Sequence, residues 1–201
     1  MTTRFRSPRR DASEQVAFEI RRYRAERDGG IFVDSAPREG MRRNLSESIA
    51  VMLETHDVSL LELVEPRISL EVPLAGLAAR HGSDAVAADL LAAIGEAEGN
   101  HPASEAFRAA DARFHRGIAG AAHNELLRAF TSWTLDVLQP SLIDTIGASM
   151  DGQAILDQHR AIQRAIRLRQ PAAAQRAMRR HLDYLSEFVR SLGPTTPMGE
   201  L

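Results

Sequence analysis

The sequence predicts an all-α fold, an antiparallel bundle of six or seven helices. From about Leu45 onward, apolar residues recur every three or four positions, which is helical spacing, and no segment alternates convincingly as a strand would. Turn residues leave only short connections between these segments, and short connections make consecutive helices antiparallel neighbours. With 201 residues, 44% of them hydrophobic and 26% charged, the chain can bury a sizeable core without disulfides.

The first three predicted helices cover residues 45–56, 59–82 and 83–99. Asn44 or Ser46 can cap the first helix, because short polar side chains accept hydrogen bonds from the free N–H groups at a helix start. The second helix contains Pro66 and Pro73, which should bend it or split it. The third should stop near Gly99.

Four more helices are predicted in the second half of the chain, over residues 102–123, 124–147, 155–170 and 171–192. Asn124 can end the first of these in a left-handed conformation or open the next one. Pro140 is expected to interrupt the second, whereas Pro171 suits the first turn of the last helix. The tail that follows, residues 193–201, is expected to be loose.

Composition excludes several classes of protein. The chain has no cysteine, so neither disulfides nor thiolate metal sites can form. No apolar run reaches the length of a membrane span, and the first residues lack the apolar middle of a signal peptide, so we expect a cytoplasmic protein. The formal net charge of −2 argues against a chain coated in positive charge for nucleic acid.

Local positive charge nevertheless gathers near the N-terminus. The chain contains no lysine, and many of its arginines lie in the first thirty residues: Arg4, Arg6, Arg9, Arg10, Arg21, Arg22, Arg24 and Arg27. Two interpretations are open, a solvated arm and a region that contacts nucleic-acid phosphates.

A carboxylate and an imidazole share a helix face in the segment AADARFHRGIAGAAHN, residues 109–124. Asp111 and His115 are four residues apart, so on a helix their side chains leave the same face one turn apart. Phe114 and Ile118 lie on or next to that face. The spacing therefore predicts two polar side chains turned toward the core.

Two later helices each carry one histidine near an apolar face. His159 lies beside the stripe that contains Ile162, and His181 lies one turn before Leu185. A lone histidine in such a place is more often a core residue than a ligand. Three imidazoles and one carboxylate on three helices, however, form a complete ligand set for a divalent metal, and without metal they would need several hydrogen-bond partners.

We therefore predict a metal site made by Asp111, His115, His159 and His181. Zinc, with bonds to nitrogen of about 2.1 Å, is the first candidate, and nickel, cobalt and manganese also suit a set of this kind. The remaining histidines are expected outside the site, at helix ends or in loops: His56, His81, His101 and His123.

The order of these motifs resembles a known family. D-x-x-F-H at 111–115, A-x-N at 122–124, H-x-x-I-x-x-A-I at 159–166 and A-M-x-x-H-L at 177–182 resemble the ligand-binding domain of GntR-type bacterial transcription regulators, the FadR-like branch known as the FCD domain. R-x-x-x-E at Arg67 and Glu71, followed by LAGLAAR, is similar to an earlier helix of that domain. The resemblance covers roughly residues 45–192. It implies the same four metal ligands, a cavity for a small organic acid, and a homodimer that binds DNA.

Arg67 and Asn124 are the candidate effector-binding residues. An arginine offers a fork of donors that matches a carboxylate, although Arg67 can instead be a surface residue paired with Glu71 one turn later. Asn124 can donate to the effector or cap a helix.

The N-terminal part departs from the family pattern. Residues 11–27 resemble the opening helix of a winged helix-turn-helix, and residues 29–33 resemble the last strand of its wing, with only Asp28 between them. The recognition helix that should enter a major groove is missing from this interval. We predict a winged-helix remnant and linker over 1–43, a metal- and effector-binding helical domain over 44–192, a tail over 193–201, and weak, salt-sensitive DNA binding through the arginines alone.

Three functions are compatible with these patterns. The first is an effector-sensing domain of a transcription regulator that does not itself catalyse a reaction. The second is a metal-dependent enzyme, because a divalent ion with open positions can activate water, although no separate general base stands at a readable spacing beside the ligands. The third is a helical bundle with a purely structural metal.

Overall fold

The computed structural model describes residues 48, 51, 52, 55 and 58–191. Within them the chain forms α-helices, one short 3-10 helix and no strand, which confirms the predicted all-α bundle. The elements are α3 (Leu60–His81), α4 (Asp84–Ala97), α5 (Glu105–Ala121), α6 (Glu125–Ile146), η1 (Gly147–Ser149), α7 (Gly152–Arg167) and α8 (Pro171–Ser191). The predicted N-terminal remnant at 1–43 and the tail at 193–201 lie outside the described residues, and of the predicted helix at 45–56 only residues 48, 51, 52 and 55 are described.

Short polar side chains start five of the helices. Each accepts a hydrogen bond from a backbone N–H of the first turn, which satisfies a group that the helix itself leaves free: Ser59, Ser83, Ser104, Asn124 and Asp151. At α3, Glu62 also reaches back to the backbone of Ser59 and completes a capping box. Between α5 and α6 it is His123 that adopts the left-handed conformation, with a φ of 55°, so Asn124 is free to open α6.

The prolines do not divide their helices. α3 runs without a break through Pro66 and Pro73, and α6 runs through Pro140, so the split that was one of two expectations for α3 and the interruption expected in α6 were wrong. A proline inside a helix costs about 3 kcal/mol because it removes one hydrogen bond and crowds the preceding turn. α3 packs against α5, α6, α7 and α8, and this burial offsets that cost.

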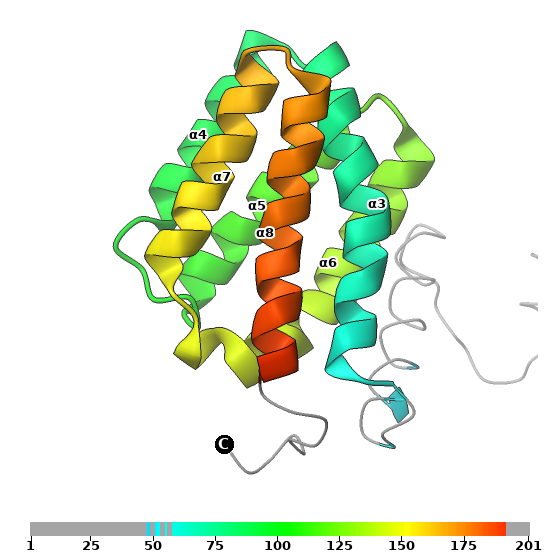
Figure 1. Ribbon diagram of the computed structural model, residues 1–201, viewed down its shortest axis with the longest axis vertical. Helices are drawn as coiled ribbons and strands as arrows, with labels where there is room; N and C mark the ends of the chain where they lie inside the picture. The colour runs from blue at the N-terminus through cyan, green and yellow to red at the C-terminus, as the bar shows by residue number, and fades with distance from the viewer. Residues whose placement is uncertain (1–47, 49–50, 53–54, 56–57, 192–201) are drawn as a thin grey trace, which may run out of the picture. The chain divides into compact units, whose positions relative to one another are not determined.

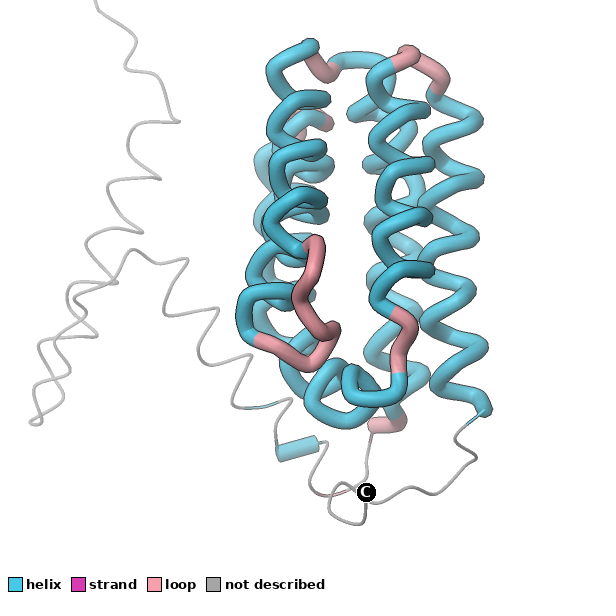
Figure 2. Tube along the Cα trace, turned by 90° about the vertical axis from the view of Figure 1, so that its left-hand side faces the viewer, coloured by secondary structure: helices cyan, strands magenta, loops and turns pink. Residues whose placement is uncertain are grey.

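The helices pack so that four of them face a common interior. α3 lies beside α8, and α8 lies beside α7, as Figure 1 shows, while α5 packs against α3, α4 and α6. The connections are short and lie at the helix ends (Figure 2), which makes α7 and α8 antiparallel neighbours. Large apolar side chains fill most of this interior, among them Phe114, Ile118, Ile162, Met178 and Leu182.

No helix in the described part of the chain combines the length and the apolar composition needed to cross a membrane.

Two glycines of α5 provide a test of the helix packing. A Cβ at Gly120 would meet no atom within 4 Å, whereas a Cβ at Gly117 would lie 2.9 Å from Cδ2 of the buried Leu90 on α4. Gly120→Ala should therefore raise the free energy of unfolding by about 0.5–1 kcal/mol, because alanine loses less backbone entropy on folding than glycine does. Gly117→Ala should gain less or lose stability, since Leu90 must move. Urea unfolding of the two variants measures both free energies of unfolding, and a larger increase in Gly117→Ala than in Gly120→Ala would contradict the close approach of α4 and α5.

Candidate metal centre

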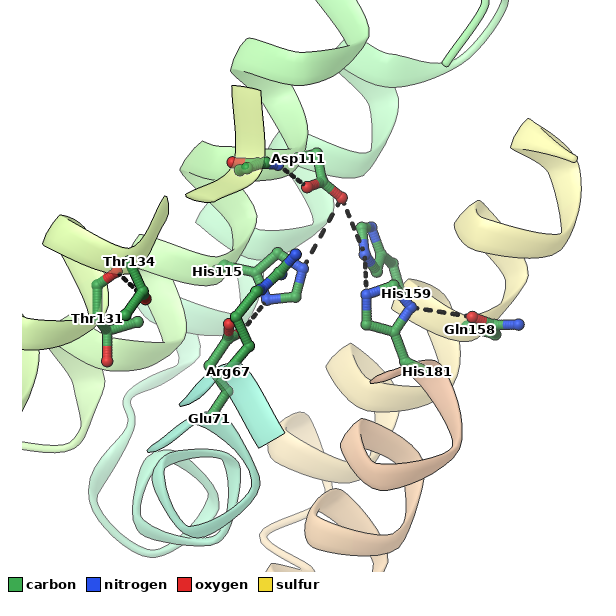
Figure 3. A network of polar contacts seen from close by, with 10 residues as sticks. Arg67, Glu71, Asp111, His115, Thr131, Thr134, Gln158, His159 and His181 are labelled. Atoms are coloured by element: carbon green, nitrogen blue, oxygen red, sulfur yellow. Dashed lines mark hydrogen bonds and ion pairs between the residues drawn. The ribbon is translucent and has the colours of Figure 1, made fainter. Parts of the chain in front are cut away.

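Three helices bring the four predicted ligands to one place in the interior. Asp111 and His115 extend from α5, His159 from α7 and His181 from α8, and all four are buried (Figure 3). On α5 the core residue Phe114 lies next to the pair, so the burial of the apolar face carries the polar pair inward, as the spacing predicts.

The ligand atoms converge on a common point. Asp111 Oδ1 lies 3.3 Å from His159 Nε2 and 3.8 Å from His115 Nε2, and the Nε2 atoms of His159 and His181 are 3.4 Å apart. One ligand atom from each of the four residues lies within 4.8 Å of all the others. Metal bonds of about 2.1 Å place tetrahedral ligands about 3.4 Å apart, so this arrangement needs only small shifts to hold an ion.

The hydrogen bonding of the histidines also fits a metal. His115 Nε2 is buried and makes no hydrogen bond to a described residue, whereas Nδ1 contacts Glu71 Oε2. Buried polar atoms without partners are rare and costly. Three imidazole nitrogens and one carboxylate oxygen are a ligand set that zinc, nickel, cobalt and manganese accept, so the residues present fit a divalent ion.

The protonation of the cluster favours the metal-binding form. Burial lowers the pKa of His159 well below its usual value, and the nearby His115 and Arg67 lower it further. Burial likewise lowers the pKa of His181, with His159, His115 and Arg67 adding to the effect. Both imidazoles are therefore neutral at pH 7, and a neutral imidazole is the form that binds metal.

Two glutamines orient the ligands from outside the cluster. Gln139 on α6 donates a hydrogen bond from Nε2 to Asp111 Oδ2, which leaves Oδ1 directed at the common point. Gln158 Oε1 lies 2.9 Å from His181 Nδ1 and accepts a hydrogen bond from Nδ1–H, so that Nε2 keeps a free lone pair. These partners were missed from the sequence. The burial of Gln139 could have been predicted, because it lies on the same helical stripe as the buried Leu135 and Ile143.

Arg67 and Glu71 form a buried ion pair on α3, next to the cluster. Arg67 Nε donates to Glu71 Oε1 at 2.7 Å, and the two residues are 2% and 1% exposed. The pairing of Arg67 with Glu71 is therefore present, but the alternative that placed this pair at the surface was wrong. Burial alone would raise the pKa of Glu71, but Arg67 and His115 hold that pKa well below its usual value, so the carboxyl group is ionised. Arg67 Nη2 is buried and has no hydrogen-bond partner among the described residues.

A pocket adjoins the cluster. It is partly open to the solvent. Its polar lining includes the ion-pair arginine and two of the candidate ligands, and the full lining is Arg67, Phe107, Arg108, Asp111, Gln139, Ile143, Met150, Ile155, His181, Tyr184 and Leu185. Asn124 is not among these residues. Its exposed side chain accepts from the N–H of Leu127 at 3.0 Å, which is the capping role considered for it.

Comparison with known proteins assigns the chain to a family. The FCD domain model matches residues 62–184, more than half of the chain. The chain belongs to the FCD domain family. The matched range contains Arg67, Glu71 and all four candidate ligands.

A solved structure supports the same fold for this FCD domain. A GntR protein from Streptococcus agalactiae superposes with a TM-score of 0.59 at 20% sequence identity, and the match covers 87% of this chain and 98% of that one. No curated protein sequence matches the chain. The resemblance to FCD-containing GntR-type regulators is thus confirmed. The FCD domain is a regulatory, non-enzymatic domain of such regulators, which confirms the prediction of a regulator over an enzyme.

The other histidines of the FCD domain that the structure describes stay outside the site, as predicted. His81 is exposed at the end of α3, His101 is exposed in the loop before α5, and His123 is exposed between α5 and α6. His56 lies outside the described residues.

The two glutamines should matter for metal affinity. Gln139→Leu and Gln158→Leu should each weaken metal binding by about 10- to 100-fold, because each removes the hydrogen bond that orients one ligand. Gln153→Leu is a matched control, since Gln153 is exposed on α7 and its side-chain amide donates to Asp157, which is not one of the candidate ligands. Competition against a chelator of known affinity measures the change, and wild-type affinity in both site variants would contradict the orienting role.

Acid should destabilise the metal-free FCD domain through His159 and His181. The pKa of an unfolded histidine is about 6.5, and the pKa of each buried histidine is well below this. As the pH falls through 6.5, the unfolded chain takes up protons that the folded one excludes, so the free energy of unfolding falls. His159→Leu should reduce this slope between about pH 7 and about pH 5. Urea unfolding of chelator-treated protein at several pH values gives the slope, and an unchanged slope in the variant would refute the assignment.

Proposed function

We propose that this FCD domain senses a small carboxylate with the help of a divalent metal ion and thereby controls the DNA binding of a GntR-type regulator. The observation that carries the proposal is that the buried Nη2 of Arg67 has no hydrogen-bond partner among the described residues, while Arg67 lines a pocket together with Asp111 and His181. A buried guanidinium nitrogen without a partner calls for an acceptor, and a carboxylate is the acceptor that matches its shape and charge.

The ligand set supports the metal half of the proposal. Asp111, His115, His159 and His181 would hold the ion, with zinc first and nickel, cobalt or manganese as alternatives. When bound, such an ion supplies positive charge and open coordination positions for an oxygen of the effector. Gln139 and Gln158 keep the ligand atoms aimed at it.

The rest of the pocket supports an effector with a hydrocarbon part. Apolar side chains from several helices also line it, among them Phe107, Ile143, Met150, Ile155 and Leu185. Small-molecule sites of this kind obtain affinity from apolar burial and specificity from a few polar groups. We therefore propose a small organic acid whose carboxylate meets Arg67 and whose remaining atoms contact this apolar wall.

Regulation of DNA binding then follows if the effector binds one conformational state of the protein more tightly than another. An effector shifts the relation between domains or subunits only as far as its affinities for the two states differ. The proposal includes a homodimer and DNA as partners of the full regulator, as the family resemblance implies.

Calorimetry of the metal-loaded protein tests the proposal. Lactate, citrate and acids with a longer hydrocarbon part are titrated into wild type, Arg67→Met and chelator-treated protein. At least one acid should bind the wild type, and its affinity should fall by about 10- to 100-fold in Arg67→Met, because charge-assisted hydrogen bonds are lost. Chelation should weaken binding as well.

Arg113→Met is the matched control, because Arg113 is an exposed arginine of α5 paired with Glu96. It should bind the acid as the wild type does. If Arg67→Met bound the acid as tightly as the wild type, Arg67 would not belong to the site. If no acid released or absorbed heat on titration, the result would favour a purely structural metal.

A further inference from the structure

One carboxylate contacts both halves of the proposed site. Glu71 is 1% exposed on α3, and its two oxygens have different partners. Oε1 accepts from Arg67 Nε at 2.7 Å, and Oε2 contacts His115 Nδ1 (Figure 3). Arg67 belongs to the pocket for the acid, and His115 belongs to the metal cluster.

The contact with His115 selects which ring nitrogen faces the metal. An ionised carboxylate beside Nδ1 places the imidazole proton on Nδ1. Nε2 then keeps its lone pair, and Nε2 is the nitrogen on the side of Asp111 Oδ1, 3.8 Å away. A carboxylate behind a metal-binding histidine also holds the ring in place.

The contact with Arg67 orients the guanidinium. Its nitrogens lie in one rigid plane, so a hydrogen bond at Nε restricts the direction of the others. With Nε bonded to Glu71, Nη2 is buried and has no partner in the described part of the chain, and Arg67 lines the pocket. The donor available to the acid is therefore presented by Glu71.

We propose that Glu71 is a positioning residue that couples metal binding to carboxylate binding, an inference that rests on the function proposed above. Each oxygen of Glu71 serves one partner, so a movement of the carboxylate that favours one contact disturbs the other. Occupation of the metal cluster holds His115 and Glu71 in place and so prepares Arg67 for the acid. Coupling of this kind is reciprocal, because each ligand changes the affinity for the other by the same factor.

Glu71→Gln is the direct test. A neutral amide has one oxygen, so it can accept from Arg67 or from His115 but presents N–H to the other. Co²⁺ is the probe, because its visible absorption reports its ligands. Without any acid, Co²⁺ affinity should fall by about 10- to 100-fold, with a changed spectrum. Acid affinity at saturating Co²⁺ should fall too. Glu96→Gln, which removes an exposed carboxylate paired with Arg113, should change neither value.

Arg67→Met separates coupling from a simple ion pair. It should lose acid binding yet bind Co²⁺ at least as tightly as wild type, because Glu71 still faces His115 and a positive charge near the ion is gone. If Glu71 served only to pair Arg67, Glu71→Gln would bind Co²⁺ like the wild type, and that result would overturn the inference.

A double variant keeps the test decisive if Glu71→Gln alone does not fold. Glu71→Gln leaves the charge of Arg67 buried without a counterion, whereas Arg67→Met/Glu71→Gln removes both charges. Circular dichroism checks the fold. The double variant should show the weakened Co²⁺ affinity of Glu71→Gln, and wild-type affinity would overturn the inference while leaving the proposed function intact. A wild type that binds neither Co²⁺ nor any acid would overturn both.

Discussion

The burial of charge inside a helical bundle is the constraint on which the rest of this structure depends. Arg67 and Glu71 are almost fully removed from water, and burying either charge without the other would cost folding free energy. Their mutual contact offsets part of that cost, and the contact of His115 Nδ1 with the other oxygen of Glu71 offsets more of it. Among the described residues, the arrangement still leaves buried Arg67 Nη2 and His115 Nε2 without a hydrogen-bond partner. Those atoms are where a carboxylate and a metal ion would complete the core.

The scaffold suits this task because every ligand extends from a helix. Helices that pack at fixed distances hold side chains more precisely than loops do, and the helix starts are secured by polar caps such as Ser59 and Asp151. The four predicted ligands come from α5, α7 and α8, and the ion pair comes from α3. α3 packs against the other three helices, and the stacked rings of His115 and His181 join α5 to α8, so the four helices share one polar centre.

The same contacts favour binding over proton transfer. Glu71, a buried carboxylate near the cluster, is held ionised by Arg67 and His115 and has an oxygen directed at each. A general base needs a carboxylate or imidazole that is free to take a proton from a bound substrate. A regulatory domain needs instead that its polar groups change partners when a ligand arrives, and this agrees with membership of the FCD domain family.

The sequence by itself determined the helical fold and the identity of the four clustered residues, because helical periodicity is local. A spacing of four residues places Asp111 and His115 on one face whatever the rest of the chain does, and the apolar neighbours of His159 and His181 turn those faces inward. Several helix starts were equally readable, since a cap acts within one turn. These features could be predicted without knowing which helices touch.

Only the tertiary structure decided what surrounds the cluster. Gln139 reaches Asp111 across 28 positions and Gln158 reaches His181 across 23, and no local pattern pairs residues at such separations. Whether Arg67 is exposed depends on α3 being covered by α5, α6, α7 and α8, and the same covering lets that helix continue through two prolines. Periodicity tells which face of a helix is buried, but the packing of other helices against that face decides which partners a buried polar group finds.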